Sequence, residues 1–350
     1  METILAIDLG KFKSCFCMLN TQTGEQTFST EKSSREDFFH IFRKLQGGNS
    51  IVLFEAGSQA GWVSDMLREM RISFKAANVT HPAWRWKENQ SKSDKKDAQR
   101  MIHMYTTGFF PEVHIPLRQT REKKSLLVYR EILVRKIKKI KNFIRALLAS
   151  HAVELPSGKK CWTKEFRYDL NDVAMQMELI EDVEMLWKGQ LYLELKQLDM
   201  LENMLANVEK KLDSLAADNK NIALLKTIPG VGPRTAEALV YTIDDPHRFK
   251  NSRQVSSYVG LCPRRYQSGN TDHSGGISKR GSNLLRALLT QAAWSSLKAG
   301  WSADMYKRVR QGSSKRGTIA IIAVARHILI RSWAMLRDGR EWNESKFKAA

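Results

Sequence analysis

The chain has 350 residues, of which 42% are hydrophobic and 27% charged, an ordinary composition for a globular protein and a length sufficient for two or three domains. Its charge is unusual, because 57 Lys and Arg against 37 Asp and Glu give a net charge of +20, which indicates a polyanionic partner such as nucleic acid. Four scattered cysteines without a C-x-x-C pair give no signal of a disulfide framework or a zinc knuckle. Since no signal peptide or long apolar span is evident, we expect a cytoplasmic protein without a membrane partner.

The first part of the chain predicts an α/β domain. Short apolar runs bounded by turn residues predict strands, and they alternate with segments of helical periodicity. The expected strands are residues 4–7, 15–19, 25–30, 51–54 and 72–76, and the expected helices are residues 37–45 and 60–70. Three strands in a meander followed by strands with helical crossovers predict a mixed sheet.

Four carboxylates in this domain form a candidate metal site. Asp8 and Glu55 each end an apolar strand, whereas Asp94 and Asp97 are three residues apart and so lie on one face of a helix. An isolated aspartate in a buried strand is costly unless something pairs with it. Mg²⁺ is held by a few carboxylates plus substrate phosphates, and two such ions about 4 Å apart would stabilise both reacting oxygens of a phosphodiester displacement.

Two long helical patterns, at residues 117–148 and 169–215, predict an antiparallel helical or coiled-coil stalk. The first carries eleven Lys or Arg against two acids between Arg118 and Arg145, which favours a face that follows phosphates over a merely solvated one. Aromatic and basic residues also alternate between residues 80 and 100. The candidate nucleic-acid contacts in these segments are Trp84, Trp86, Arg135, Lys138, Lys139 and Lys141.

A third region begins near Lys220 with the sequence I-P-G-V-G-P. Gly230 and Gly232 permit a tight turn that aims backbone N–H groups and a helix N-terminus at a phosphate, with Arg234 just beyond. This pattern is typical of a helix-hairpin-helix that binds the DNA backbone. We therefore expect three domains, at residues 1–116, 117–219 and 220–350, the last mostly helical.

A glycine- and serine-rich loop between residues 260 and 286 is the second motif of this region. Its glycines permit close backbone approach and its basic side chains suit phosphates. The basic candidates are Arg264, Arg265, Lys279, Arg280 and Arg286. Ser268 offers a nucleophile that would need activation by a base or a metal, although the residues alone do not distinguish it from Ser274, Ser278 or Ser282.

Both ends of the chain resemble one family. Asp8, Glu55 and the S-x-x-D-A-like run carrying Asp94 and Asp97 resemble the N-terminal RuvC-like DEDD domain of a family of insertion-sequence transposases. The stretch G-L-x-P-R-x-Y-x-S-G…G-G-I-S-K-R-G-x-x-x-L-R is similar to that family's C-terminal transposase domain. The family is that of the RNA-guided bridge recombinases, which includes pilin-gene DNA invertases. The resemblance covers nearly the whole chain and is least specific in the stalk.

The resemblance implies an RNase H-like domain, a coiled-coil linker and a helical domain bearing the serine. Carried over to this sequence, it makes Asp8, Glu55, Asp94 and Asp97 ligands of Mg²⁺ and makes Ser268 the nucleophile of a covalent phosphoserine intermediate. It also implies double-stranded target and donor DNA, a structured bridge RNA that pairs with both, and a dimer or tetramer with a composite site across protomers. The basic stalk helix and the Trp84/Trp86 region are then candidates for RNA contact.

Three other functions compete with this interpretation. A metal-dependent nuclease or junction resolvase would hydrolyse DNA and use Ser268 only as a phosphate contact. A sugar-kinase-like or actin-like ATPase also begins with A-I-D-L-G, but such a chain needs a second phosphate loop and an adenosine motif that we do not find. A non-catalytic nucleic-acid scaffold would leave the acids at the strand ends unexplained.

Overall fold

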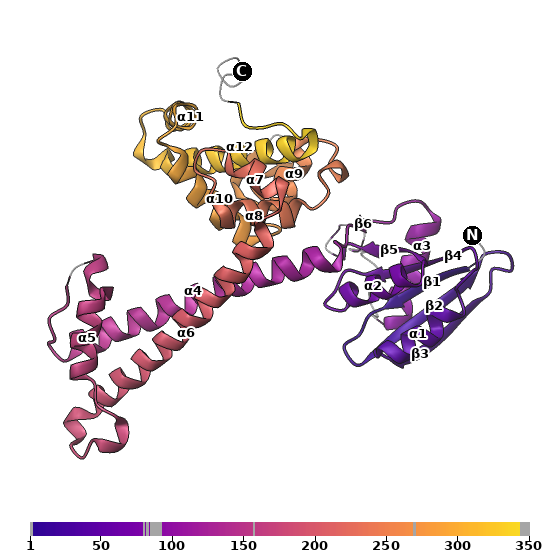
Figure 1. Ribbon diagram of the computed structural model, residues 1–350. Coiled ribbons are helices and arrows are strands. Elements are labelled where there is room, and N and C mark those ends of the chain that lie inside the picture. Colours follow the sequence, from indigo (N-terminus) through magenta and orange to yellow (C-terminus); the bar gives the residue numbers. More distant parts are fainter. Residues whose placement is uncertain are drawn as a thin grey trace. The chain divides into compact units, whose positions relative to one another are not determined.

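The computed structural model describes residues 3–79, 81, 84, 93–156, 158–268 and 271–343, with the backbone alone at residues 159, 265, 266, 268 and 271–274 (Figure 1). The chain divides into two compact units, Met1–Arg121 and Glu122–Ala350. The boundary falls in the first turn of α4 (Arg118–Ser150). The further separation of residues 117–219 from residues 220–350 stays a prediction.

The first unit contains a six-stranded mixed sheet in the order β3-β2-β1-β4-β5-β6. β2 pairs antiparallel with β1 and β3, β4 pairs parallel with β1 and β5, and β6 pairs antiparallel with β5. The strands are β1 (Thr3–Asp8), β2 (Lys13–Asn20), β3 (Gln26–Lys32), β4 (Ser50–Glu55), β5 (Ser73–Ala77) and β6 (Glu112–Val113). The predicted mixed sheet is confirmed, and β6 is an addition too short to leave a pattern.

Helices cover both faces of this sheet (Figure 1). On one face, α1 (Arg35–Arg43) and α2 (Ala60–Glu69) pack on Leu5 and Ile7 of β1. On the other, α3 (Asp94–Thr106) packs on Ile4 and Ala6, the alternate residues of the same strand. Because successive side chains of a strand point to opposite faces, Asp8 belongs to the face that α3 covers.

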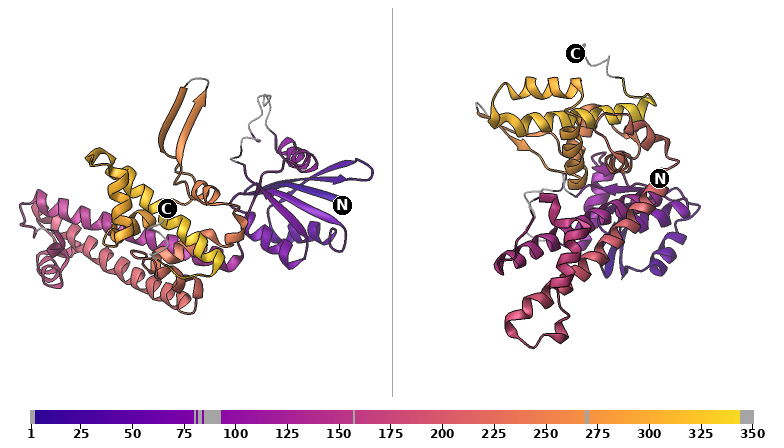
Figure 2. Two further views of the ribbon diagram at one scale, coloured as in Figure 1. Left: turned by 90° about the horizontal axis from the view of Figure 1, so that it is seen from above. Right: turned by 60° about the vertical axis from the view of Figure 1, so that its left-hand side comes forward.

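The stalk consists of α4 and α6 (Leu186–Ala216), which lie along each other in both views of Figure 2. One apolar cluster joins them, formed by Leu133, Ile137, Ile140, Ile144 and Leu148 of α4 with Leu191, Leu195, Leu198 and Leu201 of α6. These residues follow the predicted four- and three-residue steps on each helix. Coiled-coil geometry stays a prediction.

The helix expected over residues 169–215 is interrupted, and that expectation was wrong. α5 (Lys164–Val173) ends early, and two short 3₁₀ turns, Met177–Leu179 and Val183–Met185, lead into α6. The Asp182 side chain accepts a hydrogen bond from the Glu184 backbone N–H at 2.9 Å, which competes with helical pairing. Like charges at helical spacing in this acidic stretch further disfavour a continuous helix.

The rest of the second unit is a helical bundle around α12 (Gly317–Asp338), with one β-hairpin extending from it (Figure 2). Its other elements are α7 (Lys220–Lys226), α8 (Pro233–Ile243), the 3₁₀ turns Pro246–Arg248 and Ser314–Arg316, α9 (Ser252–Val259), β7 (Pro263–Ser268), β8 (Thr271–Ile277), α10 (Asn283–Ser296) and α11 (Gly300–Arg310). In the described part of the chain, Ser314–Asp338 alone is long and apolar enough to span a membrane. Half of its most apolar part is buried inside the bundle, so we assign this helix to the core of the second unit.

Candidate active site

Asp8 and Glu55 lie side by side at the end of two neighbouring parallel strands. Ile7 of β1 pairs with Phe54 of β4, so the next residue on each strand is one of the two acids. Both acids share the face of the sheet that α3 covers, and neighbouring strands are about 4.8 Å apart. The structure therefore brings these two predicted site residues together.

The first turn of α3 carries the other two carboxylates over the same face. Ser93 caps this helix by accepting a hydrogen bond from the Lys96 N–H, and acids in a first turn suit the helix dipole. Burial raises the pKa of the Cys15 thiol, and the negative charges of Asp8 and Asp94 raise it further. Cys15 lies opposite Asp8 in the pairing of β1 with β2. Since the charge of Asp94 acts on Cys15, Asp94 lies near the same edge of the sheet as Asp8. A carboxylate oxygen of Asp97 lies 3.8 Å from a guanidinium nitrogen of Arg100 on the same helix.

The chemistry of these donors suits Mg²⁺, since all four side chains offer only carboxylate oxygens. Among the described residues, however, no three His, Cys, Asp or Glu side chains lie close enough to hold a metal ion. Carboxylates repel one another when no cation lies between them, and those in the first turn of a helix can change rotamer. A cation would therefore have to draw the acids of α3 toward Asp8 and Glu55.

The turn after Asp8 is held by residues that sequence reasoning missed. The Gln59 side-chain amide donates to the carbonyl of Gly10 at 2.7 Å, and the Ser33 hydroxyl donates to the same carbonyl at 2.7 Å. A Cβ on Gly10 would lie 2.0 Å from the Lys13 carbonyl oxygen, so this position requires glycine. No sequence signal links Gln59 to a residue 49 positions earlier.

Ser268 is the last residue of β7, and its backbone pairs with Thr271 at the tip of the β7–β8 hairpin. Its side chain and that of Arg265 lie outside the part of the chain whose side chains are described. Two rival serines have structural partners. The Ser282 hydroxyl caps α10 by accepting from the Leu285 N–H at 3.1 Å, and the Ser278 hydroxyl lies 3.6 Å from the Cys262 sulfur at the base of the hairpin.

The base of this hairpin is held by close backbone contacts and by Arg286. A Cβ on Gly260 would lie 2.2 Å from the Arg280 carbonyl oxygen, and one on Gly281 would lie 2.0 Å from that of Tyr258. The Arg286 guanidinium donates to the carbonyls of Val259 at 3.0 Å and Arg280 at 2.5 Å. Arg286, predicted as a phosphate contact, therefore joins the two ends of the hairpin.

Replacing Arg286 with Ala should destabilise the hairpin base by about 2 kcal/mol, because two charged hydrogen bonds to backbone carbonyls are lost. We expect faster amide hydrogen exchange between residues 260 and 281 and a lower melting temperature. Arg280, whose side chain is exposed, provides the control, and Arg280→Ala should change neither. Equal exchange in both variants would show that Arg286 does not hold the hairpin.

The I-P-G-V-G-P turn between α7 and α8 presses against α10. Gly230 has φ +87°, and a Cβ there would lie 2.6 Å from the Ala292 carbonyl oxygen and from the Ser296 nitrogen. Gly230 therefore serves packing, whereas Gly232 is the exposed N-cap of α8. A grip on the DNA backbone by this turn stays a prediction, and it would fall to the α8 N-terminus.

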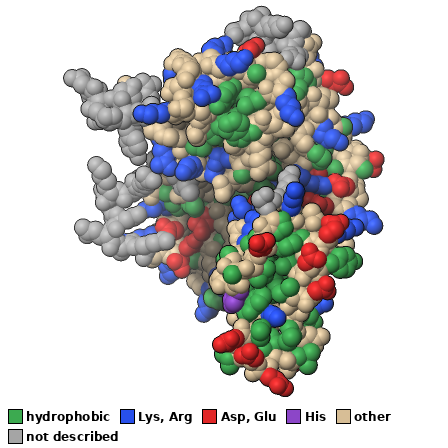
Figure 3. Space-filling view, turned by 90° about the vertical axis from the view of Figure 1, so that its left-hand side faces the viewer, with side chains coloured by type: hydrophobic (Ala, Val, Ile, Leu, Met, Phe, Trp, Pro, Cys, Tyr) green, Lys and Arg blue, Asp and Glu red, His purple; other side chains and the backbone are tan. Residues whose placement is uncertain are grey.

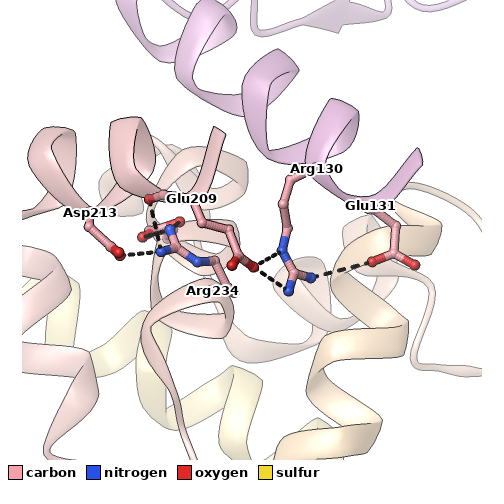
Figure 4. A network of polar contacts seen from close by, with 6 residues as sticks. Arg130, Glu131, Glu209, Asp213 and Arg234 are labelled. Atoms are coloured by element: carbon pink, nitrogen blue, oxygen red, sulfur yellow. Dashed lines mark hydrogen bonds and ion pairs between the residues drawn. The ribbon is translucent and has the colours of Figure 1, made fainter. Parts of the chain in front are cut away.

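Arg234, the predicted phosphate contact of this turn, belongs to an ion-pair network (Figure 4). It donates to both carboxylate oxygens of the fully buried Glu237, at 2.6 and 2.8 Å, and pairs with Asp213 of α6. Glu209, also of α6, accepts from Arg130 of α4 at 2.9 and 2.7 Å. The network, which we call the stalk joint, thus ties α8 to both stalk helices.

Some of the predicted nucleic-acid contacts are exposed, whereas others are engaged within the fold. Arg135, Lys138 and Lys139 are exposed, although Arg135 lies 3.7 Å from Glu131. Lys141 is instead paired with Glu202 at 2.7 Å, and Trp84 packs against the core beneath α3. Arg264, Lys279 and Arg280 are exposed around the hairpin base, and Trp86 lies outside the described residues.

Two family models match the chain. A DEDD transposase model of the IS110 type, described as "Transposase", matches residues 5–152, and "Transposase IS116/IS110/IS902 family" matches residues 222–308. The chain has the two domains of an IS110/IS116 family transposase. The first match contains the acidic edge of the sheet, and the second contains the α7–α8 turn and the β7–β8 hairpin.

Relatives of this transposase carry matching names. The chain is 27% identical over 294 residues to the transposase for insertion sequence element IS1111A of Coxiella burnetii, covering 83% of this chain and 76% of that protein. It is 23% identical over 366 residues to a putative transposase (y4pF/y4sB) of Sinorhizobium fredii, covering 100% and 88%. It is 33% identical over 129 residues to the pilin gene-inverting protein of Moraxella bovis, covering 36% and 40%.

The two matches indicate the general activity. IS110-type transposases cut and rejoin DNA for transposition, and their DEDD domain has a RuvC-like, metal-dependent nuclease fold. The acidic edge of the mixed sheet lies within the stretch that matches the DEDD model.

Proposed function

We propose that this transposase cuts and rejoins DNA through a covalent phosphoserine at Ser268, with Mg²⁺ held by Asp8, Glu55, Asp94 and Asp97. The observation that carries the metal part is the in-register pair of Asp8 and Glu55 beneath the first turn of α3. The metal would supply charge stabilisation to the oxygens of the reacting phosphodiester. Because the protein acts on DNA, we place it in the cytoplasm, at the nucleoid when it acts.

Ser268 is suited to the covalent step because it lies at the tip of a hairpin whose two ends are held in place by the rest of the unit. Its hydroxyl oxygen would form a bond to phosphorus while the bond from phosphorus to a sugar oxygen breaks. The serine proton would pass to a base, and the departing sugar oxygen would end as a hydroxyl. The phosphoserine conserves the energy of the broken bond, so attack by another sugar hydroxyl rejoins DNA without a high-energy cofactor.

Replacing Ser268 with Ala should abolish the protein–DNA adduct that survives denaturing electrophoresis. The assay uses the purified protein with its co-purifying RNA, Mg²⁺ and DNA that spans the element junction. Ser278→Ala is the matched control, because Ser278 lies at the fixed base of the same hairpin, and it should still form the adduct. DNA cleavage that persists in Ser268→Ala without any adduct would instead establish a hydrolytic nuclease.

We further propose a structured guide RNA and a second copy of the chain as partners. The exposed side chains of Arg135, Lys138 and Lys139 on α4 supply a basic face for RNA. A groove between α4 and α6 suits another copy, because its lining includes apolar Ile140 and Phe143 together with Lys136 and Glu194. Two such grooves related by a two-fold axis would place lysine opposite glutamate.

Light scattering before and after ribonuclease treatment tests both partners at once. Before treatment we expect a mass of at least two chains plus nucleic acid, and the nucleic-acid part should disappear afterwards. A Phe143→Asp variant should lower the protein mass, because a charge in an apolar interface is strongly unfavourable. A single RNA-free chain under all conditions would contradict both proposals.

A further inference from the structure

An aromatic ladder lies on the surface formed by α10 and α11. Trp294 of α10 is 52% exposed, a large fraction for so apolar a side chain. Its ring centroid lies 5.9 Å from that of Tyr306 on α11, with the planes tilted by 54°. The Arg310 guanidinium lies 6.0 Å from the Tyr306 ring. One arginine and two rings thus form a continuous row that ends in an open indole.

The segment around this ladder is strongly basic. Residues 298–316 contain six Lys or Arg and one acid, Asp304. In the described part of the chain, none of the six forms an ion pair. They are Lys298, Lys307, Arg308, Arg310, Lys315 and Arg316. Positive charge here is therefore available to a partner, in contrast to the paired arginines of the stalk joint.

The surface view shows how charged side chains are distributed over one face of the second unit. In Figure 3, Lys and Arg side chains surround hydrophobic ones on the upper part of the second unit, whereas acidic side chains gather on the lower end of the stalk. Unpaired positive charge beside an open aromatic ring suits a polyanion that also offers flat apolar faces. A protein partner with an acidic surface would need only the lysines and arginines, and not the exposed aromatic ring.

We propose that the α10–α11 surface binds an unpaired strand of nucleic acid, with a base stacked on Trp294 and phosphates on the surrounding Lys and Arg side chains. A base in a duplex is covered on both faces by its neighbours, so only an unpaired base can stack on a protruding ring. The proposal deepens the proposed function and rests on it, since unpaired strands arise when DNA is opened or when a structured RNA presents a loop.

Binding of short fluorescent oligonucleotides to the full chain tests this site. The probes are an oligouridylate, an oligothymidylate and a duplex of the same length, measured by anisotropy over a range of salt. Trp294→Ala should weaken binding of the single-stranded probes by about tenfold and that of the duplex by less than about twofold. Trp294→Phe should restore most of the affinity, because a phenyl ring also stacks.

Ile319→Ala is the matched control, because Ile319 is 58% exposed on the same unit but cannot stack on a base, and it should bind all three probes as the wild type does. Equal affinity of wild type and Trp294→Ala for the single strands would overturn the proposal. So would an equal loss for the duplex, or a fall in oligomer mass, which would mark a subunit contact. A preference between the uridylate and thymidylate probes assigns the strand to RNA or DNA.

The test does not depend on the serine chemistry. Ser268→Ala should bind the single-stranded probes as tightly as the wild type. In one outcome the wild type forms no covalent adduct while Trp294→Ala still weakens binding of the single-stranded probes. That result would contradict the phosphoserine mechanism and would still support the nucleic-acid site on α10 and α11.

Discussion

Replacing Asp8 with Asn should lower DNA cleavage by about a thousandfold and should leave the fold intact. Asparagine keeps the size of aspartate and can occupy the end of β1, but it removes one of two adjacent negative charges. Loss of charge stabilisation worth about 4 kcal/mol at a metal-assisted phosphodiester displacement corresponds to this factor. The rate of cutting of junction DNA at saturating Mg²⁺ measures the effect.

A glutamate at the opposite edge of the sheet provides the control for this prediction. Glu25 lies in the turn between β2 and β3, beside Asn20, which pairs with the first residue of β1. Glu25→Gln removes the same charge from the same domain and should retain full cleavage. Cleavage by Asp8→Asn at the wild-type rate, with an unchanged melting temperature, would remove Asp8 from the catalytic edge.

Replacing Arg234 with Ala should cost about 3–5 kcal/mol of unfolding free energy, because it leaves the buried Glu237 carboxylate without its partner. The variant should melt well below the wild type, and its DNA affinity should be unchanged wherever it remains folded. Lys226→Ala, at the exposed end of α7, is a control that should leave stability unchanged. A stable Arg234→Ala protein with weakened DNA binding would show that the arginine grips phosphate, as its motif suggested.

Glu237 also gives the stalk joint a pH dependence. Burial raises the pKa of this carboxyl above the ordinary glutamate value, against the opposing effect of Arg234. The folded state then binds a proton more readily than the unfolded state, so the contribution of Glu237 to stability falls as pH rises through this window. Relative to Glu237→Gln, the wild type should lose stability from about pH 4 upwards. The opposite slope would show that the ion pair outweighs burial.

Residues that act through local geometry could be predicted from the sequence. Asp8 and Glu55 follow apolar runs, and parallel strands bring their ends to one edge, so their meeting needed only the correct strand order. Ser34 likewise caps α1 by accepting a hydrogen bond from the Asp37 N–H, only three residues further along the chain. In such cases the cause and its effect lie within a few residues or one sheet register.

Residues whose partners are distant in sequence could not be assigned. Arg234 was predicted to bind phosphate because it follows a glycine turn, yet its partner Asp213 lies 21 residues earlier. Arg286 and Lys141 were predicted likewise, and the structure shows them bonded within the fold. A basic residue looks the same in a sequence whether it faces solvent or a buried acid.

The structural role of a glycine could not be assigned from the sequence for a related reason. The turn at Gly230 was expected to expose backbone N–H groups, but its missing side chain makes room for the backbone of α10. Both uses require the same residue, and only the position of α10 distinguishes them. The break between α5 and α6 also escaped prediction, because an apolar step pattern continued through a cluster of acids.

Mass-spectrometric mapping of the protein–DNA adduct tests the central claim most directly. Protein trapped on junction DNA in Mg²⁺ is digested with nuclease and protease, and the phosphate remnant is located on a peptide. We predict a nucleotide remnant on the hydroxyl of Ser268 and none on Ser274, Ser278 or Ser282. A remnant on another residue, or efficient cleavage that leaves none on the protein, would contradict the phosphoserine mechanism.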